Sequence, residues 1–284
     1  MKKVGMVLEG GAMRGLYTIG VLDVLMENNI EIDGIVGVSA GALFGANYFS
    51  NQKSRALRYT KNYFNDKRYI SKRSLFLTGN IVNKKFAYYR VTKELDPFDN
   101  DTFMKKNKDY YVTATNVETG KAEYFKINDV YKQLEELRAT SSMPLVSRFV
   151  KINGKKYLDG GISDSIPIDK CKSLGYKKII VVLTQPSGYN KKPLTKDKLK
   201  IAKLRYFRHK NLLKTMEERY KKYNSTLEKI SDMEEKKEIF VIRPSKKISI
   251  NLIPKSKAEI DKVYNLGVND CKKIIKDLIK YLNN

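Results

Sequence analysis

The stretch LEGGAMRGLYTIGVL, residues 8–22, decides the fold. Its first residue ends the run KKVGMVL, which is apolar after two lysines and predicts a buried strand. From Gly15 onward the apolar residues recur near helical spacing, at Leu16, Ile19, Val21, Leu22 and Leu25. The glycines between the two patterns allow another group to approach the backbone closely. That group is either the phosphates of a dinucleotide or a charge that develops on a substrate oxygen.

The same pattern follows a second time in IDGIVGVSAGALFGANYF, residues 32–49. A short apolar strand at residues 35–38 leads into a helix of small and apolar residues. Strand, helix, strand and helix in this order predict an α/β fold with a parallel sheet covered by helices.

Further elements follow along the chain. Residues 53–65 read as a helix, and the polar stretch up to Lys93 reads as an irregular lid or cap segment. The sequence YYVTATNVETGKAEYFKI, from Tyr110, predicts two strands around a turn. A hairpin in SRFVKINGKKYLDGG turns at Asn153-Gly154, a pair favoured in type I′ turns, and brings Asp159 to a strand end.

The last third of the chain changes in composition. After a buried strand at residues 178–184, a basic loop leads into a long helix with an apolar stripe, then a strand in EIFVIRP and a C-terminal helix through Tyr281. We therefore predict that residues 1–185 form the core of the fold. Residues 186–284 are predicted to be a basic loop, amphipathic helices and one strand packed on that core.

Composition excludes some classes of protein. Hydrophobic residues make up 42% and charged residues 31% of the 284 residues, which suits a globular domain, and no apolar run of about 18 residues is present. The start lacks the apolar core of a signal peptide, so we expect a cytoplasmic protein. Cys171 and Cys271 stand far apart without a partner at ligand spacing, so we expect buried or incidental thiols and no metal site.

The pentapeptide GVSAG, residues 37–41, fits the G-x-S-x-G pattern of a nucleophilic serine on a cramped turn between strand and helix. Ser39 is therefore the candidate nucleophile. The single histidine, His209, lies among cations in RYFRHKNLLK, and we interpret it as a surface residue of a basic helix. The base for Ser39 is then a carboxylate.

The chain resembles the bacterial patatin-like phospholipases through EGGAMRG (residues 9–15), GVSAG and DGG (residues 159–161), in that order. The segment RATSSMPLV, from Arg138, also resembles a part of the family that precedes DGG, and the likeness covers residues 3–185. The resemblance implies a three-layer α/β/α sandwich with a mainly parallel sheet and a C-terminal helical extension. It also implies a lipid acyl hydrolase of phospholipase A type. Since the sequence shows no calcium loop and no metal cluster, we expect this activity to need no cofactor.

The resemblance assigns roles to individual residues. Ser39 would attack an ester carbonyl and Asp159 would take its proton, whereas Asp164 is the alternative carboxylate. The backbone amides of Gly10, Gly11 and Ala12 would form an oxyanion hole. Ala12 stands where the family has a third glycine, and Ser165 stands where relatives often have asparagine.

Five more residues would support the site. Arg14 either steers a phosphate or carboxylate or ties the loop to neighbouring carbonyls, and both interpretations stay open. The other supporting residues are Gly37, Gly41, Gly160 and Gly161.

Two other classes of function compete with this one. A dinucleotide-binding domain would use Asp33 after the glycine-rich loop, but Ala12 breaks the required glycine pattern. A net charge of +25 suggests a polyanion partner, concentrated in the basic segment at residues 191–214. No nucleic-acid motif accompanies it. The segment suits peripheral contact with an anionic membrane better, and a solvated helix and loop is the remaining alternative.

Overall fold

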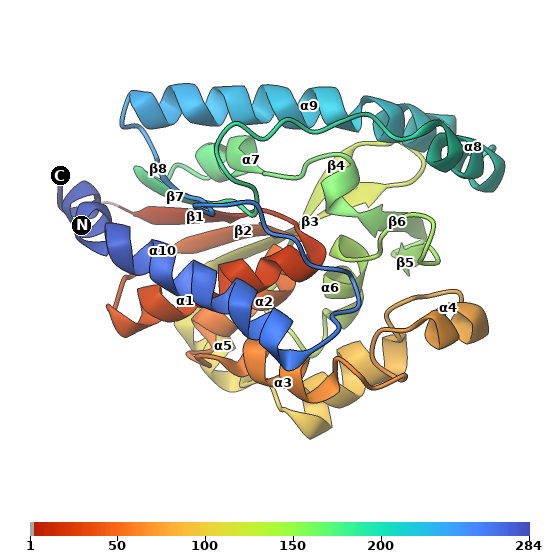
Figure 1. Cartoon of the computed structure of the whole chain (residues 1–284), viewed down its shortest axis with the longest axis horizontal. Coiled ribbons are helices and arrows are strands. Elements are labelled where there is room, and N and C mark those ends of the chain that lie inside the picture. Colours follow the sequence, from red (N-terminus) through yellow and green to blue (C-terminus); the bar gives the residue numbers. More distant parts are fainter. Residues whose placement is uncertain (1–2) are drawn as a thin grey trace.

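The computed structural model describes residues 3–284, and its centre is a single mixed sheet (Figure 1). The strand order is β5-β6-β3-β2-β1-β7-β8, and β4 also pairs with β3. Pairing is parallel from β3 through β2, β1 and β7 to β8, and antiparallel between β3 and β4, β3 and β6, and β5 and β6. The strands are β1 (Val4–Leu8), β2 (Gly34–Val38), β3 (Asp109–Asn116), β4 (Ala122–Lys126), β5 (Val150–Ile152), β6 (Lys155–Asp159), β7 (Lys178–Val182) and β8 (Phe240–Ile242).

Helices cover both faces of the sheet and confirm the three-layer α/β/α sandwich. Figure 1 shows α7 and α9 on one face, and α1, α2 and α10 on the other. The helices are α1 (Gly15–Glu27), α2 (Ala40–Phe49), α3 (Arg55–Tyr63), α4 (Lys72–Thr78), α5 (Asn100–Lys106), α6 (Leu134–Thr140), α7 (Ile168–Ser173), α8 (Lys196–Arg205), α9 (Lys210–Glu235) and α10 (Lys257–Asn283). Short 3-10 turns at η1 (Ala12–Arg14) and η3 (Gly160–Ile162) follow β1 and β6.

The C-terminal segment continues the fold of the first 185 residues. Strand β8 pairs in parallel with β7, so it extends the same sheet by one strand. Helix α10 lies directly on α1, and glycines make that approach possible. A Cβ at Gly20 would lie 2.3 Å from the Tyr264 carbonyl oxygen, and one at Gly267 would lie 2.1 Å from the Tyr17 carbonyl oxygen. The two backbones therefore touch where neither helix has a side chain.

The expectation of an irregular segment up to Lys93 is wrong. This stretch forms α4, whose first turn is capped when Ser71 Oγ accepts a hydrogen bond from the Ser74 amide, and a π-helix, η2 (Lys84–Leu95). In η2 the buried residues Phe86, Tyr88 and Val91 follow one another at spacings of two and three residues, which is not the apolar stripe of an amphipathic α-helix. An α-helical pattern could not reveal it.

The predicted hairpin is confirmed. Strands β5 and β6 pair around Asn153 and Gly154, whose φ angles of 48° and 76° lie in the left-handed region that a type I′ turn requires. Asp159 is the last residue of β6.

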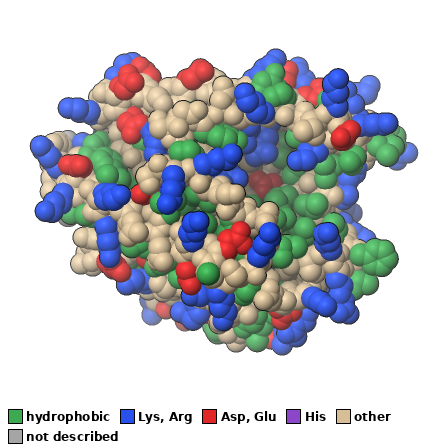
Figure 2. Space-filling model, viewed as in Figure 1, with side chains coloured by type: hydrophobic (Ala, Val, Ile, Leu, Met, Phe, Trp, Pro, Cys, Tyr) green, Lys and Arg blue, Asp and Glu red, His purple; other side chains and the backbone are tan. Residues whose placement is uncertain are grey.

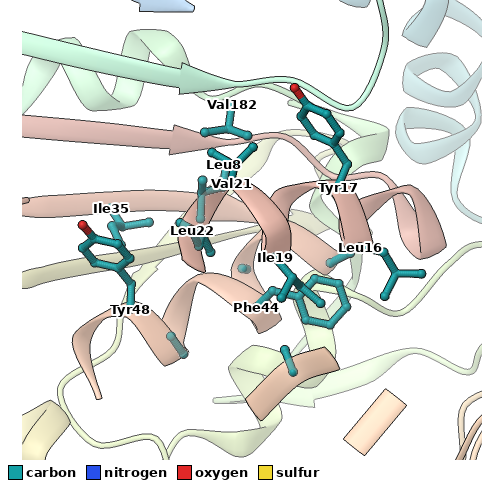
Figure 3. Packing of buried hydrophobic residues seen from close by; sticks show 14 of the residues in the cluster. Leu8, Leu16, Tyr17, Ile19, Val21, Leu22, Ile35, Phe44, Tyr48 and Val182 are labelled. Carbon is teal, nitrogen blue, oxygen red and sulfur yellow. The ribbon is translucent and has the colours of Figure 1, made fainter. Parts of the chain in front are cut away.

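A hydrophobic cluster between the sheet and helices α1 and α2 fixes the loops that follow β1 and β2. Figure 3 shows Leu8 and Ile35 from the strands facing Leu22 and Phe44 from the helices. Leu8, Leu22 and Ile35 are almost completely buried. Each such side chain contributes about 1.5–3 kcal/mol on burial, so the ends of β1 and β2 are held firmly.

Candidate active site

Strands β1 and β2 are parallel and in register, so their carboxyl ends meet at the same edge of the sheet. The glycine-rich loop follows β1, and Ser39 follows β2 directly. The two segments touch, because a Cβ at Gly10 would lie 3.2 Å from Ser39 Cβ. The carboxyl edge of a parallel sheet is where ligand sites form in open α/β folds.

Ser39 occupies a sharp turn between β2 and α2. Its φ of 52° and ψ of −124° lie outside the common regions for a residue with a side chain. The Ser39 amide donates a hydrogen bond of 2.9 Å to Thr140 Oγ1, so α6 supports this turn. Strain of this kind costs about 1–3 kcal/mol and persists only where the surroundings enforce it.

Glycines around Ser39 allow backbones to meet. A Cβ at Gly41 would lie 2.6 Å from the Leu8 carbonyl oxygen and 2.7 Å from that of Glu9, and one at Gly37 would lie 2.7 Å from Ala42 Cα. These positions have no space for a side chain, as the G-x-S-x-G interpretation requires.

We therefore expect Gly41→Ala to displace the glycine-rich loop from Ser39. A shift of about 1 Å is enough to reduce catalysis about 100-fold. The measurement is the rate of ester hydrolysis with the thermal unfolding temperature recorded in parallel. Near-normal rates in this variant would contradict the close packing of the two segments.

Ser39 and Asp159 form a direct hydrogen bond. Ser39 Oγ donates to Asp159 Oδ2 at 2.6 Å, and both side chains are buried. The Gly161 amide donates to Asp159 Oδ1 at 2.7 Å, which fixes the carboxylate plane. The backbone after Asp159 also packs tightly, because a Cβ at Gly160 would lie 2.1 Å from the Thr113 carbonyl oxygen.

The surroundings of Asp159 make it a stronger base than a free aspartate. Burial raises the pKa of its carboxyl above the ordinary value, against smaller opposing effects of the Ser39 and Gly161 hydrogen bonds and of the Arg219 charge. A higher pKa brings a general base closer to neutral pH.

The other predicted candidates for the base lie elsewhere. Asp164 accepts a hydrogen bond of 2.7 Å from the Tyr124 hydroxyl and has none with Ser39. His209 is not the surface residue that we expected, because its side chain is only 14% exposed. It precedes α9 and stands edge-on to the Phe149 ring, with Nδ1 3.6 Å from Glu118 Oε2.

The glycine-rich loop holds three backbone amides near Ser39, and they differ in whether they already donate a hydrogen bond within the protein. The Gly10 amide donates a hydrogen bond of 3.3 Å to the Ser165 carbonyl oxygen, whereas no acceptor for the Gly11 and Ala12 amides is found within residues 3–284. Ala12 has a φ of 47°, a left-handed conformation that suits glycine, the residue that the family resemblance implies at this position, better than alanine.

Arg14 does not tie this loop to neighbouring carbonyls. Its Nε atom is buried without a hydrogen-bond partner, and its guanidinium makes no hydrogen bond or ion pair in the part of the chain that the structure describes. Of the two interpretations of Arg14, steering of an anion is the one that agrees with this geometry.

An apolar cavity of about 120 Å³ opens beside Ser39. It is lined by side chains of α2, η2 and α6, which include Leu43, Phe44, Tyr88, Val91, Leu134 and Leu137, and by Met143, which follows α6. The contribution of η2 to the cavity was not predicted, because the stretch up to Lys93 was interpreted as an irregular lid or cap segment.

The dinucleotide alternative fails on position. Asp33 precedes β2 and therefore lies at the opposite end of the strands from the glycine-rich loop. There its Oδ2 accepts a hydrogen bond of 2.9 Å from the Val4 amide and its Oδ1 lies 2.6 Å from Lys108 Nζ. It cannot reach a ribose bound at that loop.

The remaining structural observations concern cysteines, metals and membranes. Cys171 and Cys271 are both buried as expected, and burial raises the pKa of each thiol to about 12. Within residues 3–284 we find no cluster of three or more His, Cys, Asp or Glu side chains with the geometry of a metal site. None of the helices in the same range is long and apolar enough to span a bilayer.

Comparison with known proteins adds the following. The chain is 30% identical over 190 residues to the uncharacterized protein YjjU of Escherichia coli K12, a match that covers 65% of this chain and 53% of YjjU. It is 27% identical over 187 residues to lysophospholipase nte1 of Aspergillus niger, which covers 64% of this chain and 12% of that protein. The chain thus spans about half of the first relative and about an eighth of the second.

A structural likeness to VipD from Legionella pneumophila covers 97% of this chain and 67% of VipD, with 12% identity and a TM-score of 0.46. Two family models match the sequence. A domain of unknown function (DUF6363) matches residues 209–283. The model of the patatin-like phospholipases matches residues 6–171 and includes the glycine-rich loop, Ser39 and Asp159. The chain belongs to the patatin-like phospholipase family.

Proposed function

We propose that this protein is a lipid acyl hydrolase that cleaves carboxylic ester bonds through Ser39 and Asp159. The hydrogen bond of 2.6 Å between Ser39 Oγ and Asp159 Oδ2 carries the proposal, because it places a base in contact with the only proton that must leave the nucleophile. Membership of the patatin-like phospholipases and the lysophospholipase among the relatives support a lipid substrate.

The reaction proceeds in two halves. Ser39 Oγ attacks the ester carbonyl carbon while Asp159 takes the hydroxyl proton, and a tetrahedral intermediate forms. The intermediate collapses, the alcohol leaves with the proton from Asp159, and the acyl group stays on Ser39. Asp159 then takes a proton from water, which attacks the acyl carbonyl and releases the carboxylic acid. The proton returns to Ser39.

The glycine-rich loop would stabilise the oxyanion. The amides of Gly11 and Ala12 have no acceptor among the described residues, so they can donate to the oxygen that gains charge. One such donor lowers the activation barrier by about 3 kcal/mol. The Gly10 amide joins them only if its bond to Ser165 opens. The apolar cavity beside Ser39 would hold the acyl chain.

The test is a panel of purified esters with a common acyl chain, namely a lysophospholipid, a diacyl phospholipid, a monoacylglycerol and a p-nitrophenyl ester. Release of the fatty acid and the alcohol is measured with and without EDTA. We expect hydrolysis of at least one lipid ester and no loss with the chelator. The absence of hydrolysis from the whole panel would contradict the proposed function.

We further propose that the protein works at an anionic lipid surface. Helix α8 and the residues after it expose Leu204 at 81% and Phe207 at 62%, and α4 exposes Phe76 at 90%. Both helices lie next to residues 145–148. Arg205 on α8 donates hydrogen bonds to the Leu145 and Ser147 carbonyl oxygens. The Arg148 amide donates to Asn80 Oδ1, just after α4. Figures 1 and 2 show both helices at one end of the molecule, with Lys and Arg side chains around the exposed apolar ones. Exposed apolar groups ringed by cations are typical of peripheral membrane contact.

Vesicle sedimentation tests this contact. We expect the wild type to bind anionic vesicles at low salt, and Phe76→Ser with Leu204→Ser to weaken binding about tenfold or more, since each apolar group contributes roughly 1.5–3 kcal/mol when buried. Ile279→Ser on α10, also a partly exposed apolar residue, is the control. Equal binding by all three proteins would contradict the surface. Retention on DNA at the same ionic strength, without vesicle binding, would favour nucleic acid instead.

A further inference from the structure

Three cationic side chains from separate segments lie close enough to influence one another, and one of them, Arg219, lies beside Asp159. Arg14 follows the glycine-rich loop, Lys191 belongs to the basic loop after β7, and Arg219 lies on α9. Arg219 is close to the pair, because a Cβ at Gly161, the residue whose amide holds Asp159, would lie 3.3 Å from Arg219 Nη2. Lys191 Nζ lies 4.4 Å from the ring centre of Tyr223, one turn beyond Arg219 on α9. We call Arg14, Lys191 and Arg219 the cation cluster.

The protein does not neutralise the cation cluster directly. None of its members forms an ion pair within residues 3–284, although 18 other ion pairs occur there. The Nε atoms of Arg14 and Arg219 are buried without a hydrogen-bond partner. Glu9 is a nearby carboxylate, but its oxygens are taken by the Tyr223 hydroxyl at 2.6 Å and the Thr184 amide at 2.5 Å. Burial, followed by the Arg219 charge and, to a smaller extent, the Arg14 charge, lowers the pKa of Lys191 to about 8, and the Glu9 charge opposes this shift only in part.

Opposite walls of the site therefore have opposite chemistry. The cavity that reaches Ser39 is apolar, whereas Asp159 and Gly161 lead from Ser39 to the cation cluster. Figure 2 shows a hollow on this face, with an acidic side chain at its floor, Lys and Arg side chains on the side towards α9, and hydrophobic side chains on the other side. An ester with an apolar chain on one side and an anionic group on the other matches this arrangement.

We propose that Lys191 and Arg219, together with Arg14, bind the phosphate group of the ester substrate. Phosphate oxygens accept several charge-assisted hydrogen bonds at once and would satisfy the donors that the protein leaves unpaired. The proposal rests on the proposed function and adds to it. It assigns to the C-terminal segment, including the part matched by the domain of unknown function, one half of the substrate site.

The test compares two short-chain esters with the same acyl group, a lysophospholipid that carries phosphate and the matching monoacylglycerol, both below their critical micelle concentrations. We expect Lys191→Gln to raise KM for the phosphate ester about tenfold or more, the usual effect of losing a bond to a charged group. Its kcat/KM for the neutral ester stays within about twofold. Lys221→Gln, which removes one charge from an exposed position of α9, changes neither value.

Arg219→Gln gives a second readout. It raises KM for the phosphate ester in the same way. It also moves the acid limb of the pH–rate profile for the neutral ester to higher pH, because the Arg219 charge no longer lowers the pKa of Asp159. Lys191→Arg, which keeps the charge, retains low KM. Equal loss on both esters in Lys191→Gln, or an unchanged KM for the phosphate ester, would overturn the proposal.

Inorganic phosphate and glycerol 3-phosphate distinguish the source of the anion. Competition by either one against the neutral ester, lost in Lys191→Gln, assigns the site to phosphate itself. A KM effect without such competition assigns it to phosphate attached to the lipid. The thermal stabilisation of the protein by these two anions is also measured, so the cation cluster is tested even if no ester is hydrolysed and the proposed function fails. In that case, the absence of any stabilisation that depends on Lys191 overturns the proposal.

Discussion

Ser39→Ala removes ester hydrolysis almost completely, with an expected loss of at least about 10³-fold in kcat/KM. The reason is chemical, since no acyl-enzyme can form without Ser39 Oγ. The hydrogen bond between the Ser39 amide and Thr140 Oγ1 does not involve the removed atom, so the turn keeps its support. The measurement is the rate of fatty acid release by the wild type and the variant at equal concentration.

The matched control for this change is Ser50→Ala, another buried serine, which ends α2 at a distance from the site. Its hydroxyl bonds the Asn47 carbonyl and Gln52, and its loss leaves hydrolysis unchanged within about twofold. If Ser39→Ala retained near-normal rates while remaining folded, Ser39 would not be the nucleophile.

Asp159→Asn lowers hydrolysis by about 10²–10⁴-fold, the contribution of a general base. An amide fits the same place without strain, because its oxygen can accept from the Gly161 amide and its NH₂ group can donate to Ser39 Oγ. The variant therefore loses the base while keeping the fold. The wild-type rate itself falls as pH drops through the pKa of Asp159, which lies above 3.8.

The same variant is more stable than the wild type at neutral pH. The pKa of Asp159 is higher in the folded protein than in the unfolded chain, where it has the ordinary value of 3.8. The folded state thus keeps a proton that the unfolded chain has released, so stability falls as pH rises from 3.8 through the folded pKa. Asparagine avoids this loss.

Thermal unfolding of the wild type and Asp159→Asn between pH 3 and pH 8 measures the effect. We expect the stability difference in favour of the variant to grow as pH rises through this window and then level off. A difference that does not vary with pH, or one that favours the wild type at pH 8, would show that burial does not raise the pKa of Asp159.

Contiguous motifs made the core of the site predictable from the sequence. The strand–glycine–helix pattern at residues 4–27, the G-x-S-x-G turn and the Asn153-Gly154 hairpin are local, so the sequence indicated where Ser39 and Asp159 would stand. Their hydrogen bond joins residues 120 positions apart and required the topology of the sheet. The sequence suggested that Ser39 and Asp159 act together only because the order of the motifs resembles that of the family.

Other parts of the site have no local signal. Thr140 lies in RATSSMPLV and Lys191 begins the basic segment at residues 191–214, but neither pattern indicated which single residue would support the turn or face the cation cluster, and nothing in its neighbouring residues marks Arg219. The π-helix η2 was missed because its buried residues, Phe86, Tyr88 and Val91, lack the spacing of an amphipathic α-helix. The sequence indicated that Ala12 restricts the φ angle at a position where glycine was expected. The φ of 47° that Ala12 adopts follows from the packing of the loop.

Labelling with a fluorophosphonate probe tests the central claim most directly, because the probe reacts with a serine only where a base and an oxyanion hole activate it. The labelled protein is digested, and the modified residue is located by mass spectrometry. We expect one label, on Ser39, that is lost in Ser39→Ala, greatly slowed in Asp159→Asn and reduced by competing lipid esters. Absence of label from the folded wild type, or a label on another residue that persists in Ser39→Ala, would contradict the account.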